Sequence, residues 1–365
     1  MAGEWRNFKV QSVGPSVAQT FAMEWQALSD NALEPAGYNA PELILPLIAN
    51  LGGVKLVTVR HGQDLLLVFP ARTKRLVTRT WDTPLTASGL PHVSGGLSES
   101  AIQALVNAQN KPLLLKAIPT EGNFFDILKR HSVHFEIIDK WQRAALRPSG
   151  IFDDWFHNNF DQKRRKELTR LRNRLSEQGS LTLEMLKAGA DANPFIEDLL
   201  VLESAGWKGK KGTAIAFKAQ HVRALHQAIN ALHKSGKLRF WSLKLNGKAI
   251  ASLYAIVEGG QGWLGKIAYD ESFAKYSPGV QIILHCTESF FSESQIKLVD
   301  SSAIPGHPMI ERIWRERIEL ATVCIGPASI NKIIFLRIVR LEQQWLFWRR
   351  LARDFYYKLR GEKRS

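Results

Sequence analysis

The sequence contains little of what defines a disulfide-rich, metal-binding or membrane-spanning protein. Its two cysteines, Cys286 and Cys324, cannot form a disulfide framework and predict a reducing compartment. Its ten histidines are scattered, with only His131 and His134 close together, so we expect no metal site. No apolar run approaches the ~20 residues of a membrane span. The first residues also lack the basic and apolar parts of a signal peptide. We therefore expect a cytoplasmic protein.

What the chain does have is an excess of positive charge, +15, and 45% hydrophobic residues, enough for a buried core. The densest basic stretch, 163–174, holds seven Lys/Arg and one Glu. A solvated basic face explains this stretch, and so does an anionic partner such as a phosphate-bearing molecule, an acidic glycan or lipid headgroups. Nucleic acid is disfavoured as a partner, because no aromatic residue lies within 161–175.

The second half of the chain has the pattern of an α/β fold. Apolar periodicity and Gly or Pro boundaries predict helices over 160–178, 194–205, 218–235 and 278–293, and a short helix near 308–316. Strands are predicted over 180–186, 238–245, 249–257, 262–269, 296–302 and 318–325. Asn246-Gly247 and Gly259-Gly260 are strong hairpin signals between the three central strands.

The first half gives a similar order of elements. Helices are predicted over 16–29, 41–51, from Ser98, and over 121–131, and strands over 7–13, 54–60, 64–70, 75–80, 111–118, 133–139 and 141–148. Two halves of about 150 residues each fit the usual size of a domain. We place their boundaries at 1–150 and 151–328, and a basic amphipathic helix at 329–365.

The stretch 262–281 carries the first chemical signal. A predicted strand ends at Tyr269-Asp270, and Ser277-Pro278-Gly279 then opens a helix. A helix N-terminus presents free N–H groups to an anion, and glycine allows a ligand to approach the backbone. This pattern is equally that of an ordinary capped helix, which is the commoner structure.

A second signal is LESAGWKGKKGTAI, residues 202–215. Glu203 ends a predicted helix, and Trp207-Lys208-Gly209 opens a flexible basic loop. Such a loop could cover a substrate and offer Trp207 and Lys208 to its phosphate or carboxylate. A glycine-rich connection with solubilising lysines has the same composition.

Four ordered blocks of the second half carry a family resemblance: DQKRRKELTRLRNRLSEQG (161–179), LESAGWKGKKGTAI (202–215), KIAYDESFAKYSPG (266–279) and VDSSAIPGH (299–307). Together they resemble the CelD-like group of GNAT-type acyltransferases, which is associated with cellulose and exopolysaccharide genes. That group is related to the Fem peptidyltransferases, which carry two GNAT-like halves. NALEPAGYNAPELILP (31–46) gives a weaker resemblance in the first half.

The resemblance implies two GNAT-like halves, each a central mixed sheet flanked by helices. It also implies that strands 262–269 and 296–302 splay apart around an acyl-CoA thioester. The pyrophosphate would lie at the helix start, which makes Ser277, Gly279, Val280 and Gln281 the cofactor-binding residues. The usual loop has the form Q/R-x-x-G-x-G/A, and here only the central glycine remains. Fem relatives take an aminoacyl group from a charged tRNA instead, so both donors stay open.

Direct acyl transfer requires groups that move protons. Candidate bases are Asp300, Glu203 and His307, and Tyr269 is a candidate acid toward the leaving thiolate. Each also has an ordinary structural explanation: Asp300 could cap the following serines or pair with Arg312, His307 could be a turn residue, and Tyr269 could belong to the core.

The C-terminal segment 331–360 predicts one long amphipathic helix. Its apolar residues recur at spacings of three and four: Ile334, Ile338, Leu341, Trp345, Trp348, Ala352, Phe355 and Leu359. The rest is largely basic, which fits an anionic membrane surface. Packing on the body of the protein or pairing in a homodimer fits the spacing as well.

The sequence thus predicts an acyl-CoA-dependent N- or O-acyltransferase, foremost an acetyltransferase, of bacterial envelope or exopolysaccharide metabolism. Its co-substrate would be acetyl-CoA or another acyl-CoA without a metal, and its acceptor a small or glycan-linked molecule. The alternatives are a Fem-like aminoacyl-tRNA-dependent transferase and a non-catalytic component of a polysaccharide-synthesis complex. The expected location is cytoplasmic, with the inner face of the membrane as a peripheral site.

Overall fold

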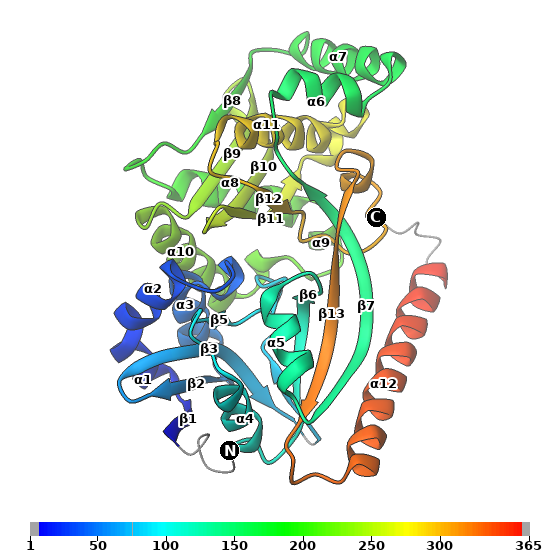
Figure 1. Ribbon diagram of the computed structural model, residues 1–365. Helices are drawn as coiled ribbons and strands as arrows, with labels where there is room; N and C mark the ends of the chain where they lie inside the picture. Colours follow the sequence, from blue (N-terminus) through cyan, green and yellow to red (C-terminus); the bar gives the residue numbers. More distant parts are fainter. Residues whose placement is uncertain (1–6, 75, 360–365) are drawn as a thin grey trace.

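The computed structural model describes residues 7–74 and 76–359, and its main feature is one continuous mixed β-sheet (Figure 1). Its 13 strands follow the order β1-β2-β3-β4-β6-β13-β7-β12-β11-β10-β9-β8, with β5 beside β3. Helices flank this sheet, so the predicted α/β class is confirmed.

The described residues of the first half form seven strands and five α-helices. The strands are β1 (Phe8–Val13), β2 (Lys55–His61), β3 (Asp64–Thr73), β4 (Thr78–Thr80), β5 (His92–Val93), β6 (Leu113–Pro119) and β7 (His134–Leu146). The helices are α1 (Pro15–Ala18), α2 (Ala22–Asp30), α3 (Pro41–Leu51), α4 (Glu99–Asn107) and α5 (Asn123–His131). The helix predicted over 16–29 is interrupted by a 3-10 turn, where the Thr20 hydroxyl donates to the Val17 carbonyl and competes with regular helix bonding.

The second half contains the remaining elements. Its strands are β8 (Leu181–Met185), β9 (Leu238–Leu245), β10 (Lys248–Glu258), β11 (Gln261–Tyr269), β12 (Leu298–Asp300) and β13 (Glu316–Gly326). Its helices are α6 (Phe152–Asn159), α7 (Gln162–Ser176), α8 (Asn193–Ala205), α9 (Trp207–Lys210), α10 (Ala219–Lys234), α11 (Pro278–Ser292) and α12 (Lys332–Leu359). The helix predicted near 308–316 is only a 3-10 turn at Ile310–Arg312.

The hairpin turns of the second half agree with the sequence. Asn246 and Gly247 have φ values of 51° and 78°, and Gly259 and Gly260 have 52° and 77°. These left-handed conformations suit the two-residue turns that join twisted antiparallel strands. The strands β9, β10 and β11 therefore form the predicted meander.

The strands near the end of each half differ from the prediction. The two strands predicted over 133–148 are one strand, β7, which pairs with β13 from His134 to Ala145. β13 comes from the end of the second half, yet it lies between β6 and β7 of the first half. β7 in turn pairs with β12 through Ala145 and Leu146. Strand exchange therefore joins the two halves into one sheet, and the boundaries placed at residues 150 and 328 stay a prediction.

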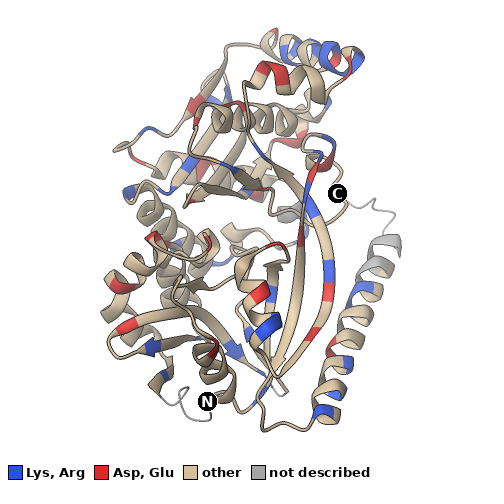
Figure 2. Cartoon of the chain, in the orientation of Figure 1, with Lys and Arg blue, Asp and Glu red and all other residues tan. Residues whose placement is uncertain are grey.

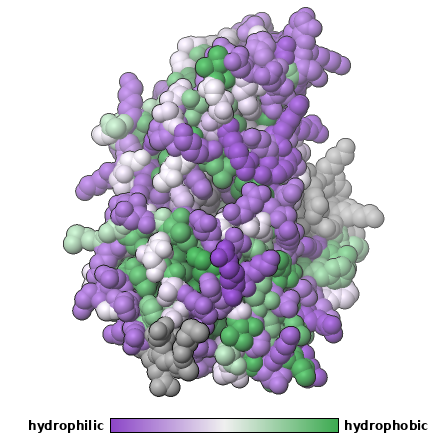
Figure 3. Space-filling model, in the orientation of Figure 1, coloured by the Kyte–Doolittle hydropathy of each residue, from purple (hydrophilic) through white to green (hydrophobic). Residues whose placement is uncertain are grey.

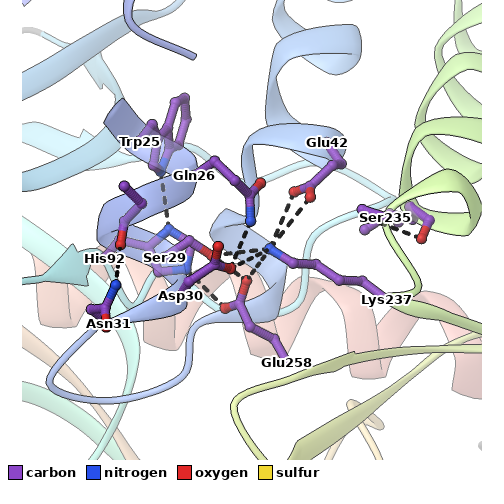
Figure 4. Close-up of polar contacts among 12 residues, drawn as sticks. Trp25, Gln26, Ser29, Asp30, Asn31, Glu42, His92, Ser235, Lys237 and Glu258 are labelled. Carbon is purple, nitrogen blue, oxygen red and sulfur yellow. Dashed lines mark hydrogen bonds and ion pairs between the residues drawn. The ribbon is translucent and has the colours of Figure 1, made fainter. Parts of the chain in front are cut away.

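A buried polar network also joins the halves (Figure 4). Glu258, at the end of β10, accepts hydrogen bonds from the Ala36 N–H at 3.0 Å and the Ser29 hydroxyl. It pairs with Lys237 at 2.9 Å and with His92 at 2.8 Å. His92 Nδ1 accepts from the Trp25 indole at 3.0 Å, so the ring proton lies on the Nε2 that faces Glu258.

The charges in this network are held by one another. Burial alone would raise the pKa of Glu258, but His92 and Lys237 outweigh it and lower that pKa to about 2. Burial opposes the charge on Lys237, but Glu258 and Glu42 outweigh it and raise the pKa of its ammonium group. A buried carboxylate with this many partners is stable as an ion, and removing one partner would be costly.

Candidate functional site

The candidate site lies where two neighbouring parallel strands diverge. β11 and β12 pair only through Gln261–Trp263 and Leu298–Asp300, after which β12 ends and β11 continues to Tyr269. The register of β10 and β11 slips here, so that residues 265 and 266 oppose the single residue Tyr254. A Cβ on Gly265 would lie 2.0 Å from the Tyr254 ring, so glycine is required for this bulge.

Tyr38, from the first half, supports the strand at the point of divergence. Its hydroxyl donates to the Leu264 carbonyl at 2.7 Å, a group that β12 no longer reaches. Tyr38 is buried, and burial raises the pKa of its phenol, which keeps it a hydrogen-bond donor. Sequence reasoning missed this residue, although it lies within the stretch 31–46 that carried the weaker resemblance.

A pocket of about 230 Å³ opens beside the end of β11 that extends beyond β12. It brings together Glu203 from the end of α8, Tyr269 from the end of β11, and His307 from the loop after β12. These are three of the four predicted catalytic residues, and they come from elements up to about a hundred positions apart. The remaining lining is Leu202, Gly206, Ile267, Ala268, Glu271, Pro308 and Met309.

His307 is a candidate base or acid in this pocket. It is partly buried, and burial lowers the pKa of its imidazole, so the neutral ring predominates at neutral pH. Its Nδ1 accepts from the Met309 N–H at 3.4 Å, which leaves the ring proton on Nε2. In this tautomer the Nε2–H can donate to a leaving group. Nδ1 can accept a proton once its 3.4 Å hydrogen bond from the Met309 N–H is broken.

Glu203 is held more firmly. Its side chain is buried, and one carboxylate oxygen accepts from the Ile215 N–H at 2.9 Å. It therefore ties the end of α8 to the segment after the basic loop. This role is structural, and it also places a carboxylate in the wall of the pocket.

The start of α11 adjoins the same pocket. Ser277 occupies the N-cap position in a left-handed conformation, and its carbonyl, not its side chain, accepts from the Val280 and Gln281 N–H groups. A Cβ on Gly279 would lie 3.1 Å from both the Tyr269 ring and the Met309 sulfur, so this glycine backs closely onto the pocket wall. Gln281 is buried, and its amide donates to the Tyr276 carbonyl. The role of these four residues in cofactor binding stays a prediction.

The basic loop predicted at Trp207-Lys208 forms the short helix α9. The side chains of these two residues lie outside the described part of the structure. Two residues on, Lys210 pairs with Glu271 at 2.6 Å, and Glu271 lines the pocket. This contact joins α9 to the pocket rim.

Asp300 lies apart from the other three predicted catalytic residues. It is buried and pairs with Arg143 of β7 at 3.0 Å, and it accepts from the Ser302 N–H at 2.8 Å. Burial raises its pKa, and Arg143 partly offsets that effect. Asp300 borders a different cavity, of about 280 Å³, between the two halves. The alternative role of capping the following serines is thus realised, with Arg143 as the partner in place of Arg312.

No metal centre is evident within residues 7–74 and 76–359, because no three His, Cys, Asp or Glu side chains gather there in a ligating group.

A third cavity, of about 420 Å³, lies between α12 and the sheet. Its lining includes Ile304 and Pro305, which belong to the same loop as His307.

Comparisons with known proteins find a domain family that is similar to part of the second half. Residues 162–302 match the family model described as an acetyltransferase (GNAT) domain. This match covers most of the second half, including β8 to β12, α8 and α11. No curated protein sequence matches the chain significantly.

Solved structures share the fold over most of the chain at low identity. The structure of FemX is similar with a TM-score of 0.57 and 9% identity, over 91% of this chain and 100% of that chain. The C-terminal domain of a putative lysylphosphatidylglycerol synthetase from Agrobacterium fabrum gives 0.55 and 10%, over 89% and 96%. The structure of L-PGS from Bacillus licheniformis gives 0.53 and 12%, over 91% and 98%. At these identities the likeness concerns the fold.

Proposed function

We propose that this protein transfers an acyl group from an acyl-CoA thioester to an amine or hydroxyl of a small or glycan-linked acceptor. The observation that carries the proposal is the convergence of Glu203, Tyr269 and His307 on one pocket beside diverging parallel strands. The GNAT domain match over 162–302 supports the reaction class. We place the reaction in bacterial envelope or exopolysaccharide metabolism, on the basis of the sequence resemblance.

The residues of the pocket suit a direct transfer. The acceptor loses a proton as its nitrogen or oxygen attacks the thioester carbonyl, and the sulfur leaves as a thiolate that gains a proton. Neutral His307 can take the first proton, or supply the second in the tautomer that the structure shows. Tyr269 also lines the pocket, and its hydroxyl is a second group that can supply a proton to the thiolate. Glu203 holds the end of α8 in place beside the pocket by accepting from the Ile215 N–H.

The donor side of the proposal rests on the start of α11 and on α7. α7 packs beside the 3-10 turn Glu271–Tyr276 that leads into α11, and it carries the whole basic stretch 163–174 (Figure 2). Cationic side chains next to a helix N-terminus favour a polyphosphate. This arrangement supports a CoA donor and also the phosphates of a larger donor.

An aminoacyl donor is the second candidate. The likeness to FemX and to a putative lysylphosphatidylglycerol synthetase domain extends over about nine-tenths of the chain, which favours a transferase with two interlocked halves. A charged tRNA would then replace acyl-CoA at the same pocket.

Calorimetric titration with acetyl-CoA tests the proposal. We expect one equivalent to bind per chain. Met309→Trp should weaken binding at least tenfold because it fills the pocket, whereas Met23→Trp, on the surface of the first half, should leave binding unchanged. Binding of charged tRNA without acetyl-CoA binding would favour the second candidate. Equal affinity in the wild type and Met309→Trp would remove this pocket as the donor site.

A further inference from the structure

The C-terminal helix α12 has two apolar faces, and only one of them is packed. Phe335, Val339 and Leu346 pack on Leu114, Ile138 and Cys324 of the sheet. In Figure 1, α12 runs along the side of the molecule next to β7. The single helix predicted over 331–360 is therefore confirmed, but its docked face is not the stripe that the spacing indicated.

Most of the predicted stripe is exposed to solvent, although Ile338 is only partly exposed and Trp345 also contacts Arg79. Ile334, Leu341, Trp348 and Phe355, at seven-residue intervals, keep 52%, 51%, 63% and 62% of their surface exposed. Nine of the twenty large apolar side chains exposed in the described chain belong to α12: Ile333, Ile334, Leu336, Leu341, Trp345, Phe347, Trp348, Leu351 and Phe355. Figure 3 shows apolar surface along the side where Figure 1 places this helix. An exposed apolar surface of this extent on one helix ordinarily marks a contact with a partner or a membrane.

The charge of α12 indicates what covers this face. From Lys332 to Leu359 the helix contains seven Lys/Arg and two acidic residues. One of the two, Glu342, is bound by Arg79 of the sheet through both carboxylate oxygens. Arg337 and Arg340 lie exposed among the outer apolar residues. The face that remains is aromatic, apolar and cationic, which complements a surface of anionic headgroups over acyl chains.

We propose that the outer face of α12 docks on a bilayer that contains anionic lipid. The helix lies in the interface and does not cross it, because no helix of the described chain is long and apolar enough to span a membrane. Docking also holds the loop of Ile304 and His307 beside the membrane-bound helix, since Ile304 and α12 border the same cavity. If the proposed acyl transfer holds, this position favours a lipid-linked acceptor.

A second copy of the chain fits the face less well. A two-stranded coiled coil buries a narrow seam of alternating three- and four-residue spacing. Here Ile333, Leu336, Phe347 and Leu351 widen the exposed apolar surface beyond that seam. Two such cationic helices would also repel each other, whereas an anionic bilayer attracts both the arginines and the apolar groups.

Vesicle flotation tests the proposal with the full chain. Vesicles of equal parts phosphatidylglycerol and phosphatidylcholine should carry the wild type at low salt, and phosphatidylcholine alone should carry far less. The double variant Leu341→Ser/Trp348→Ser should reduce the floated fraction at least fivefold without a change of net charge. The matched control Val17→Ser/Met23→Ser removes two exposed apolar residues from the first half and should float like the wild type.

Circular dichroism and analytical ultracentrifugation complete the test. All variants should melt like the wild type, because the replaced side chains are exposed. Failure of the wild type to float with anionic vesicles, or equal flotation of the α12 variant, overturns the proposal. A wild-type dimer that the α12 variant converts to monomer overturns it too, and assigns the face to a second copy. None of these results depends on acyl-transfer activity.

Discussion

The sheet contains two parallel strand pairs within the described chain, one in each half, and what surrounds them differs. β4 pairs with β6 through Thr78 and Arg79, and β11 pairs with β12 through Gln261–Trp263. Both pairs then diverge. The space beside the end of β4 that includes Thr80 and Gly89 is about 10 Å³, whereas the pocket beside the end of β11 is about 230 Å³.

The difference comes from what the chain itself places in each gap. In the first half, the Gly89 N–H donates to the Lys116 carbonyl at 2.9 Å, and the Ser88 hydroxyl donates to the Ala117 carbonyl at 3.1 Å. Residues 88 and 89 thus provide hydrogen-bond donors for two carbonyls of β6 and fill the space between β4 and β6. In the second half, Tyr38 satisfies one carbonyl of β11 and leaves room beyond it. A diverging pair of parallel strands is therefore filled by the chain in one half and borders a pocket in the other, so the fold alone does not define a site.

The largest effect we expect concerns the network that joins the halves. Glu258→Leu removes the partner of buried Lys237 and His92 and should lower the free energy of unfolding by about 3–5 kcal/mol. Urea denaturation measures this change. Glu24→Leu, which breaks an exposed pair with Arg60, should cost less than about 1 kcal/mol. Losses of similar size in the two variants would show that the halves do not depend on this network.

The same carboxylate should make stability depend on acid pH. Its pKa is lowered from 4.5 to about 2 in the folded state, so its contribution is complete above pH 4.5 and is lost as the pH falls toward 2. The contribution is about 3 kcal/mol at 1.4 kcal/mol per pKa unit. Urea midpoints measured from pH 6 to 2 should therefore fall more steeply for the wild type than for Glu258→Gln. Parallel curves would assign the acid sensitivity to other carboxyl groups.

The comparison of the two halves predicts that catalysis depends on the pocket beside the end of β11, in the second half. His307→Gln should lower kcat/KM by about 10²-fold or more, with little loss of stability because the ring is only partly buried. His131→Gln, in the first half, should leave kcat/KM unchanged. In the wild type the acid limb of the pH profile should lie below 6.5, because burial lowers the pKa of His307.

Asp300→Asn separates the two kinds of role. Asp300 is bound to Arg143 outside the pocket, so this variant should lower the melting temperature together with activity. A selective loss of kcat at unchanged stability would return Asp300 to the catalytic group.

For His307→Gln, an unaltered kcat/KM would contradict the assignment of His307 as a proton-transfer group.

Substitution of one glycine in each half should have smaller effects, and these effects should differ between the filled space and the pocket wall. A Cβ on Gly89 would lie 2.5 Å from the Thr80 hydroxyl and 2.9 Å from the Lys116 carbonyl, so Gly89→Ala should destabilise the fold by about 1–3 kcal/mol. The contacts of a Cβ on Gly279, at 3.1 Å, require only small shifts of Met309 and Tyr269. Gly279→Ala should therefore change kcat/KM more than stability. The opposite ranking, measured by thermal melts and kinetics, would show that the filled gap tolerates change better than the pocket wall.

Much of the local structure could be predicted, because it depends on neighbouring residues. Ser98 caps α4 by accepting from the Ala101 N–H, and Asp161 caps α7 in the same way from the Arg164 N–H. Leu168, Leu171 and Leu175 form the buried stripe of α7 that their spacing indicated. The choice of Glu203, Tyr269 and His307 also came from the sequence, through the ends of predicted elements and the family resemblance.

The sequence left open the points at which distant parts of the chain compete for the same position. Asp300 was a candidate base with a structural alternative, and the structure pairs it with Arg143, 157 positions earlier, in a buried ion pair. The periodicity of α12 showed a true apolar stripe, but the sheet packs on Phe335 and Val339 instead. Tyr38 was missed because a tyrosine in a loop carries no signal of the strand that it will contact.

The sequence by itself determined most of the long helices, the hairpins of the second half and the caps of α4 and α7, since a 3.6-residue or two-residue period and a left-handed turn residue act within a few positions. Only the tertiary structure decided that β13 enters the sheet of the first half between β6 and β7. It also decided that Glu258 meets Ser29 across 229 positions and that one gap is filled while the other stays open. The physical reason is that strand pairing and side-chain packing depend on which surfaces meet after the chain has folded, and many pairings satisfy the same local pattern equally well.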